Sequence, residues 1–556
     1  MSNCRDGQPK MKEDIRFRIS AKFSSSSSHI PQSLFELSLF ELPAKALGLS
    51  SMACIWLKHW VEGMMHRRAR RAGLEPREGE GVWGLIYAVH VLNPEQDASS
   101  AEHNRVWASG RLQTYKGDLI RRDAQVMGPR GGRPIECISS LDGMRVVRVA
   151  TGMSHVVLMT AHGAVLSFGD GHYGQLGHYP RTCQETRPHL IEALSKKVAV
   201  DIAAGNLFTV VLTQDYEPAT PDNKSRHVYT FGSNAYSQLG HGLTRHEAYS
   251  IREPTIVETF EGRGVARVAR VAAAGEHAAA LLVTGEVFTW GDADWAQLGH
   301  HPEDREVVTV VPPMDASNND TAHGLNVVTR PTKVPGLDGV KIVSMAVGPY
   351  HTGVVDAEGY VYTWGCSEEG KLGHGSGDLY WPEGTWEAHG IRKVERLAHK
   401  RIVKFACGSE HSLAIDSEGR LHAWGRGTHG ELGHNVMEFL RNQFKMPSFG
   451  CLDRPRAVLG FNPSCLPEPP RHSAKRAVVD VEGSSRHTLA KTCDGVLHLS
   501  GGLHESMNPV RDQPKSTQFP CPVECLQTEK VLHMSWTNEY MVTVLEGASA
   551  AASPAQ

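Results

Sequence analysis

Three glycine-rich stretches of the chain look at first like nucleotide-binding loops. Gly365-Cys-Ser-Glu-Glu-Gly-Lys371 has the spacing of a P-loop, in which a lysine and the hydroxyl after it hold phosphate and magnesium. Leu372 stands where that hydroxyl is needed, and we expect a turn to follow rather than a helix. Residues 169–174 and 425–430 both spell G-x-G-x-x-G, but neither opens a helix in a strand-helix-strand unit. None of these motifs predicts a bound nucleotide, and we expect no cofactor.

Histidines at regular intervals raise the question of a metal site. A zinc site needs three or four ligands that converge at about 2 Å, whereas one histidine per repeat places them far apart. We therefore expect a structural role, in which each histidine bridges backbone groups inside its own repeat, and we expect no metal. Cys521 and Cys525 have no second pair to complete a zinc site. No arrangement of nucleophile and base stands outside the repeat, so we expect no enzyme.

The glycine-rich stretches belong to a repeat of fixed spacing. Five copies end in a Leu-Gly-His step, and an aromatic residue followed by glycine stands eight residues before each leucine. In four copies a histidine stands thirteen residues before the aromatic residue. In the second copy Phe208 takes the place of the histidine, and an insertion near residues 217–226 lengthens the spacing to 23 residues. Such regularity indicates a repeat architecture. The repeated residues are Leu176, Leu239, Leu298, Leu372 and Leu432; Phe168, Phe231, Trp290, Trp364 and Trp424; Gly169; and His155, His277, His351 and His411.

Each repeat predicts a small antiparallel sheet. Within 402–434, three apolar runs are separated by a break and by a tight-turn sequence that contains glycine. Residues 478–501 form a degenerate sixth unit with His487, and residues 531–545 form the inner half of a seventh. Residues 105–110 supply its missing strand. We expect an all-β fold, a seven-bladed β-propeller whose N-terminal and C-terminal strands share one blade.

The ordered steps Gly-x-x-His, Trp-Gly and Gly-Gln-Leu-Gly resemble the regulator of chromosome condensation family over roughly residues 105 to 547. The resemblance implies the propeller fold. It implies less about function, because the family includes an exchange factor for a small nuclear GTPase, a plant ultraviolet-B photoreceptor, an alpha-tubulin suppressor and ubiquitin-ligase modules. In the photoreceptor, light sensing depends on clustered tryptophans in repeated Gly-Trp-Arg-His steps; no tryptophan stands directly before the repeat histidines here, which argues against light sensing.

Composition excludes other classes of protein. The chain has 556 residues, a formal net charge of −3 and 11 cysteines without framework spacing. We expect a reduced, intracellular protein in the cytoplasm or nucleus, monomeric, without a membrane span or direct nucleic-acid binding. We divide it into a disordered, partly helical extension (1–80), the propeller (81–547) and a disordered tail (548–556).

Function is expected in the long connections at 301–338, 375–400 and 435–475, which we expect on one face of the ring. Aromatic residues beside arginine are typical of binding hot spots, although these rings could instead pack under their own loops. The predicted partner-binding residues are Tyr380, Trp381, Trp386, Phe439, Arg441 and Phe444.

Two functions follow from these features. The first is a non-enzymatic scaffold that binds a protein partner: a small GTPase, a ubiquitin ligase or a modification complex. The alternative is a guanine nucleotide exchange factor for a small Ran-like GTPase. In the family's exchange factor a wedge follows the Trp-Gly step of one blade, whereas here that interval is constant in all five clear copies, which weakens this alternative.

Overall fold

The computed structural model contains two compact units, His103–Gly547 and a second unit of residues 1–102 and 548–556. In the second unit, β1 (Arg16–Phe23) pairs antiparallel with β2 (Leu85–Leu92). The propeller unit begins at His103, whereas the sequence alone leads us to expect its boundary at residue 81. The structure describes residues 16–23, 85–92, 105–110, 136–138, 141, 144–178, 183–215, 225–261, 266–301, 303–310, 324–375, 390–434, 450–458, 461, 477–502, 516–522, 531–536 and 540–545.

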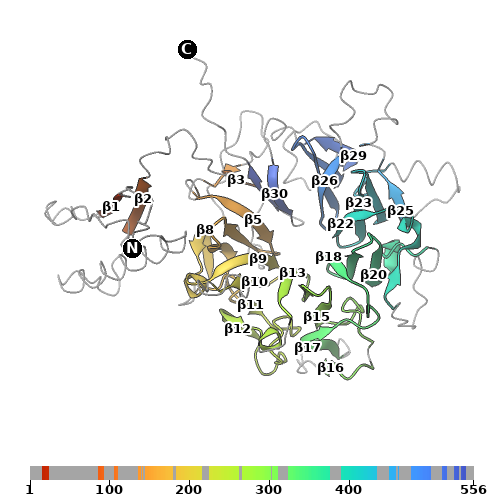
Figure 1. Cartoon of the computed structure of the whole chain (residues 1–556), viewed down its shortest axis with the longest axis horizontal. Coiled ribbons are helices and arrows are strands. Elements are labelled where there is room, and N and C mark those ends of the chain that lie inside the picture. Colours follow the sequence, from red (N-terminus) through yellow and green to blue (C-terminus); the bar gives the residue numbers. More distant parts are fainter. Residues whose placement is uncertain are drawn as a thin grey trace, which may run out of the picture. The chain divides into compact units, whose positions relative to one another are not determined.

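The larger unit is a ring of seven antiparallel sheets, the blades of a β-propeller (Figure 1). Blade 1 consists of β5 (Val146–Thr151), β6 (His155–Thr160), β7 (Val165–Asp170) and β8 (Gln184–Leu190). Blade 2 consists of β9 (Val198–Ala204), β10 (Phe208–Gln214), β11 (Arg226–Ser233) and β12 (Ser250–Ile256). Blade 3 consists of β13 (Val268–Ala274), β14 (His277–Leu282), β15 (Val287–Asp292), β16 (Val307–Val310) and β17 (Leu325–Lys333).

The remaining blades repeat this order. Blade 4 consists of β18 (Ile342–Val347), β19 (His351–Asp356), β20 (Val361–Gly365) and β21 (Arg392–Lys393). Blade 5 consists of β22 (Ile402–Cys407), β23 (His411–Asp416), β24 (Leu421–Arg426) and β25 (Cys451–Ala457). Blade 6 consists of β26 (Val478–Gly483), β27 (His487–Thr492), β28 (Leu497–Gly502) and β29 (Ser516–Pro522). Short 3-10 helices lie at η4 (Glu192–Leu194), η5 (Glu258–Phe260), η6 (Glu368–Gly370) and η7 (Glu395–Leu397).

Blade 7 joins the two ends of the propeller chain, as predicted. Its order is β30 (Val531–Trp536), β31 (Tyr540–Leu545), β3 (Arg105–Gly110) and β4 (Glu136–Cys137). β3 pairs antiparallel with β31 from Arg105 opposite Leu545 to Gly110 opposite Tyr540. The shared blade closes the ring and leaves no exposed edge at β31.

The three long connections are shorter than the sequence suggested, because each contains its blade's fourth strand. β17, β21 and β25 lie inside the segments 301–338, 375–400 and 435–475. The first segment also holds β16, which makes blade 3 five-stranded. β21 and β25 carry no apolar alternation because they are edge strands, and β25 contains Pro455, which is tolerated at a sheet edge.

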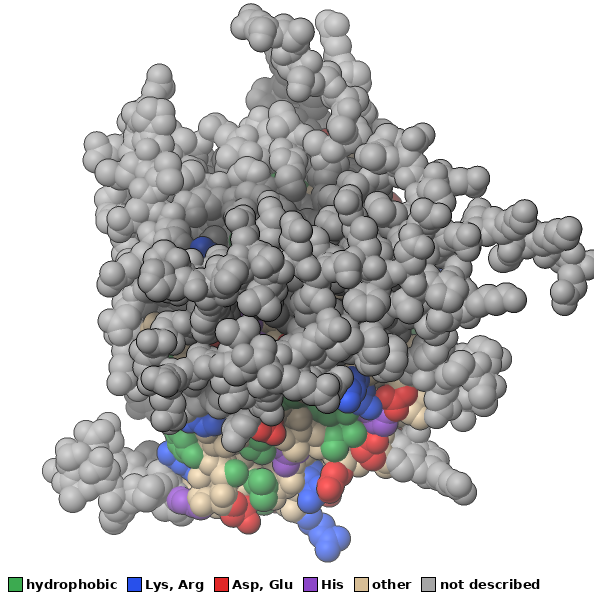
Figure 2. Space-filling view, turned by 90° about the vertical axis from the view of Figure 1, so that its left-hand side faces the viewer, with side chains coloured by type: hydrophobic (Ala, Val, Ile, Leu, Met, Phe, Trp, Pro, Cys, Tyr) green, Lys and Arg blue, Asp and Glu red, His purple; other side chains and the backbone are tan. Residues whose placement is uncertain are grey.

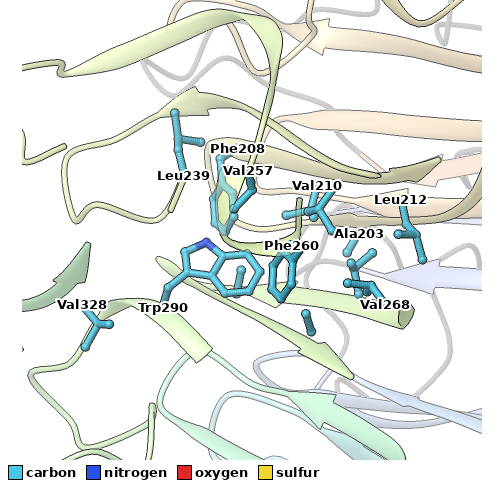
Figure 3. Close-up of a cluster of buried hydrophobic side chains, with 14 of the residues drawn as sticks. Ala203, Phe208, Val210, Leu212, Leu239, Val257, Phe260, Val268, Trp290 and Val328 are labelled. Carbon is cyan, nitrogen blue, oxygen red and sulfur yellow. The ribbon is translucent and has the colours of Figure 1, made fainter. Parts of the chain in front are cut away.

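Apolar side chains pack between neighbouring blades. Trp290, Trp364 and Trp424 are fully buried, and so are Phe208 and Phe231. Figure 3 shows Trp290 of blade 3 beside Phe208 and Leu239 of blade 2, with Phe260 adjacent. The repeated aromatic residues therefore stabilise contacts between blades rather than within single sheets.

Candidate functional site on the connection face

Each blade has two ends, because its strands are antiparallel. At one end lie the turns from first to second strand and the connections from third to fourth strand. We call this end of the ring the connection face. At the other end, which we call the hairpin face, lie the turns from second to third strand and the links to the next blade.

All three long connections begin and end on the connection face. They leave β15, β20 and β24 and return in β17, β21 and β25 of the same blades. The six predicted partner-binding residues of 375–400 and 435–475 lie outside the described residues, so their role stays a prediction. The insertion near 217–226 belongs to the turn between β10 and β11, on the hairpin face.

The repeat histidines connect neighbouring blades. Ser412 Oγ donates to the carbonyl of Lys371 at 2.8 Å, so its lone pairs accept from His351 Nε2, also at 2.8 Å. The pairs His155–Thr209, His277–Thr352 and His411–Thr488 have the same arrangement at 2.9, 3.2 and 2.9 Å. The expectation that each histidine bridges backbone groups of its own blade is wrong, because the imidazole reaches the next blade's hydroxyl instead.

Burial keeps these imidazoles neutral. Loss of solvation lowers the pKa of His155 to about 4 and the pKa values of His277 and His411 to about 3. A neutral imidazole with a proton on Nε2 is the form that the hydroxyl requires. In the described part of the chain, no group of three or more His, Cys, Asp or Glu side chains is placed to hold a metal ion.

The tryptophans form a second set of contacts between blades. Trp364 Nε1 donates to the carbonyl of Gln297 at 3.0 Å, and Trp290 Nε1 donates to that of Gln238 at 2.9 Å. Both carbonyls belong to the Gln-Leu-Gly step of the preceding blade. At Gly373 (φ +82°) a Cβ would lie 2.6 Å from Trp424 Nε1, so this step needs glycine for both conformation and space.

Lys371, the lysine of the P-loop-like motif, is fully buried between blades 4 and 5. Its Nζ forms an ion pair with Glu410, lies 3.4 Å from Cys366 Sγ and stands 5.7 Å from the Tyr350 ring centroid. Burial opposes its charge, but Cys366 and Glu410 favour it, and the pKa of Lys371 is raised overall. The charged, enclosed amine is therefore a structural cation and not a nucleophile.

Exposed and half-buried residues on the connection face form a surface that the sequence motifs did not reveal. Met153 and Tyr249 expose 56% and 47% of their surfaces. Tyr173 lies 6.1 Å from Tyr249 between ring centroids, and the Arg245 guanidinium lies 5.7 Å over the Tyr249 ring. Tyr249 stands at a position that varies among the repeats, whereas the position of Tyr173 is aromatic in three of the five clear copies, with Tyr236 and Trp295 as its counterparts.

A half-buried carboxylate and two aromatic rings continue this face toward blade 4. Trp295 packs edge-on against Tyr350 at 5.6 Å between centroids. Glu276 accepts from Asn206 Nδ2 at 3.0 Å and from Gln238 Nε2 at 2.6 Å, and burial raises its pKa to about 7. The surface is therefore amphipathic rather than purely polar.

Other described surfaces show mixed charge. On the described part of the side drawn in Figure 2, basic, acidic, histidine and hydrophobic side chains lie interspersed. None of the helices in the described ranges has the length and hydrophobicity needed to cross a membrane.

The fold and its repeated contacts between blades define the class of protein: a β-propeller of repeated units closed by a shared blade. The chain belongs to the family of the RCC1-like domain, whose model matches residues 98–385. Models of the regulator of chromosome condensation (RCC1) repeat match residues 358–415, 418–490 and 402–431.

Two curated relatives are similar to this chain in sequence. The Arabidopsis thaliana ultraviolet-B receptor UVR8 is 30% identical over 395 residues, which are 69% of this chain and 73% of the receptor. The human E3 ubiquitin-protein ligase HERC2 is 33% identical over 279 residues, which are 50% of this chain but only 5% of the ligase. The chain thus spans a small part of that ligase's length.

Two solved structures share the fold. Human WBSCR16 has a TM-score of 0.59 at 21% identity over 80% of this chain and 99% of that chain. Prp20p of Saccharomyces cerevisiae has a TM-score of 0.58 at 18% identity over 81% of this chain and 93% of that chain.

Proposed function

We propose that this chain is a non-enzymatic interaction scaffold that binds a protein partner through its connection face. The observation that carries the proposal is a coincidence of position: the three long connections begin and end on the face that exposes Met153 and Tyr249. Methionine, tyrosine and arginine are enriched in protein interfaces, and a few such residues usually carry most of the binding energy.

The polar residues of the repeat support a non-enzymatic scaffold, because they already bond to other residues of the propeller. The described histidines and hydroxyls of the repeat hold blades together, and Lys371 is committed to Glu410. These groups therefore have a structural role. We expect the partner to be recognised by the connections and by the half-exposed residues between them, which differ from blade to blade.

The partners of solved relatives suggest which classes of protein this chain binds. The solved structure of Prp20p is described with its binding properties to Gsp1p and histones, and another shows Kap60 bound to the same yeast protein. We expect this chain to bind a protein too, whether a small GTPase, a ubiquitin ligase or a modification complex. The exchange-factor alternative remains a hypothesis that the same experiment tests.

The test is affinity purification of the full chain from its native cells, followed by mass spectrometry. The triple variant Tyr380→Ser, Trp381→Ser, Trp386→Ser should lose the partners while its melting temperature stays unchanged. A variant that melts lower would show that these rings pack under their own loop. A recovered GTPase would then be tested for release of labelled GDP, and faster release with catalytic amounts of this chain would favour exchange over the scaffold.

A further inference from the structure

Three arginines gather on the hairpin face where blades 2 and 3 meet. Arg226 at the start of β11 donates from Nη1 to the carbonyls of Val268 at 2.9 Å and Ala269 at 3.4 Å. Arg267 and Arg270 flank those two residues on both sides and are exposed to solvent. The Arg226 guanidinium is thus fixed on the backbone between two further guanidinium-bearing residues.

The neighbouring carboxylates are already committed elsewhere. Asp201 forms an ion pair with Arg148 and accepts from the N–H groups of Ile202 at 3.0 Å and Val271 at 3.1 Å. Beside Arg226, the carboxylates of Asp215 and Glu261 both contact the His227 imidazole, at 2.7 Å and 2.8 Å.

Among the residues that the structure describes, Arg226, Arg267 and Arg270 form no ion pair. Burial lowers the pKa of Arg226, and the positive charges of Arg267 and Arg270 lower it further, against the opposing effect of Asp201. The one carboxylate that acts on Arg226, Asp201, is already paired with Arg148, and like charges held together are unfavourable unless a further anion joins them.

We propose that these three arginines bind a phosphate group on the hairpin face, away from the partner-binding face. Arg226 Nη1 is held on two backbone carbonyls of blade 3, so its guanidinium is fixed beside Arg267 and Arg270. Arg267 and Arg270 can add forked pairs of N–H donors, the geometry that matches phosphate oxygens. Clusters of arginine are also the usual means by which proteins recognise phosphorylated segments.

The first experiment titrates inorganic phosphate into the full chain at constant ionic strength, with chloride as the reference salt. Bound phosphate should raise the melting temperature saturably, because a ligand of the folded state stabilises it by mass action. Arg267→Ala and Arg270→Ala should each weaken the phosphate affinity about tenfold, the usual effect of losing one charge-assisted hydrogen bond.

Arg420→Ala is the matched control. Arg420 lies on the same face in the turn between β23 and β24, is half exposed, and is paired with Glu418 at 2.6 Å. The Arg420→Ala substitution removes one positive charge from the same face and should leave phosphate binding unchanged. Arg270→Lys keeps the charge but loses the fork, and should bind phosphate more weakly than wild type.

A phosphoserine peptide distinguishes the two sources of the phosphate. Tighter binding of the peptide than of inorganic phosphate, lost in Arg267→Ala, would identify a phosphorylated protein segment; equal binding would identify free phosphate. The proposal is overturned if phosphate gives no saturable stabilisation, if Arg267→Ala and Arg270→Ala keep wild-type affinity, or if Arg420→Ala loses as much. Each protein's melting temperature without phosphate serves as the folding control.

Discussion

His351 of blade 4 and Ser412 of blade 5 share a hydrogen bond of 2.8 Å, and the same hydroxyl donates to the carbonyl of Lys371 in blade 4. One serine thus joins the strand start and the Leu-Gly turn of the preceding blade. Because equivalent contacts occur at three other blade junctions, they contribute to a ring that unfolds as a unit.

Ser412→Ala should destabilise the propeller by about 1–3 kcal/mol, because it leaves His351 Nε2 and the Lys371 carbonyl buried without a partner. Urea unfolding measures the change. Ser417→Ala, at an exposed turn, is the control and should stay within about 0.5 kcal/mol of wild type. Equal stability of the two variants would show that the contact between blades contributes nothing.

Trp364→Ala should cost roughly 3–5 kcal/mol, the usual effect of removing a large buried aromatic residue. Trp364 is fully buried and its Nε1 donates to the Gln297 carbonyl at 3.0 Å. Val283→Ala, at a half-exposed turn position, provides the comparison in the same unfolding assay. A loss near 0.5 kcal/mol for Trp364→Ala would place this ring outside the core.

Deletion of residues 1–102 should leave the propeller intact, because its compact unit begins at His103. Deletion of 1–112 removes β3 and exposes the edge of β31, so we expect a lower melting temperature and aggregation. Differential scanning calorimetry with light scattering compares the two. If the shorter chain melts as cooperatively and as hot as the longer one, the shared blade does not hold the ring closed.

His411→Gln should change the pH dependence of stability in a defined direction. His411 is buried with its pKa lowered to about 3, so below about pH 6.5 the unfolded chain binds a proton that the folded chain does not. His411 therefore lowers the stability of the wild type as the pH falls. The His411→Gln variant has no such contribution, because glutamine does not titrate.

The deficit of His411→Gln relative to wild type should shrink by about 1.4 kcal/mol between pH 7.5 and 5.5. Urea unfolding of both proteins at the two pH values gives this difference. A deficit that is constant over this range would mean that His411 titrates alike in both states and is not buried neutral.

The blades of the propeller can be predicted from the sequence, but most of the connection face and the contacts between blades cannot. The fixed spacing from His351 to Trp364 predicts the blades because both residues bond to a neighbouring blade, so the constraint repeats. The same residues could not reveal that the imidazole bonds across blades, since spacing within one repeat carries no information on its neighbour.

Other features leave weaker traces in the sequence. β25 was hidden in a long connection because an edge strand needs no apolar alternation. Met153 and Tyr249 lie far apart in sequence, and only the ring brings them to one face. The same holds for Arg226 and Arg270, which come from different blades; Arg226 bonds to the carbonyl of Ala269, next to Arg270.

The most direct test of a partner-binding connection face compares two variants of equal exposure on opposite faces. Met153→Ser with Tyr249→Ser alters the connection face, whereas Val283→Ser alters the hairpin face, and each wild-type side chain is 47% to 56% exposed. We expect all three proteins to share one melting temperature, since none of these residues is in the core. Affinity purification should recover the partner with wild type and Val283→Ser but not with the double variant. Full recovery with the double variant, or loss with Val283→Ser alone, would contradict binding through the connection face.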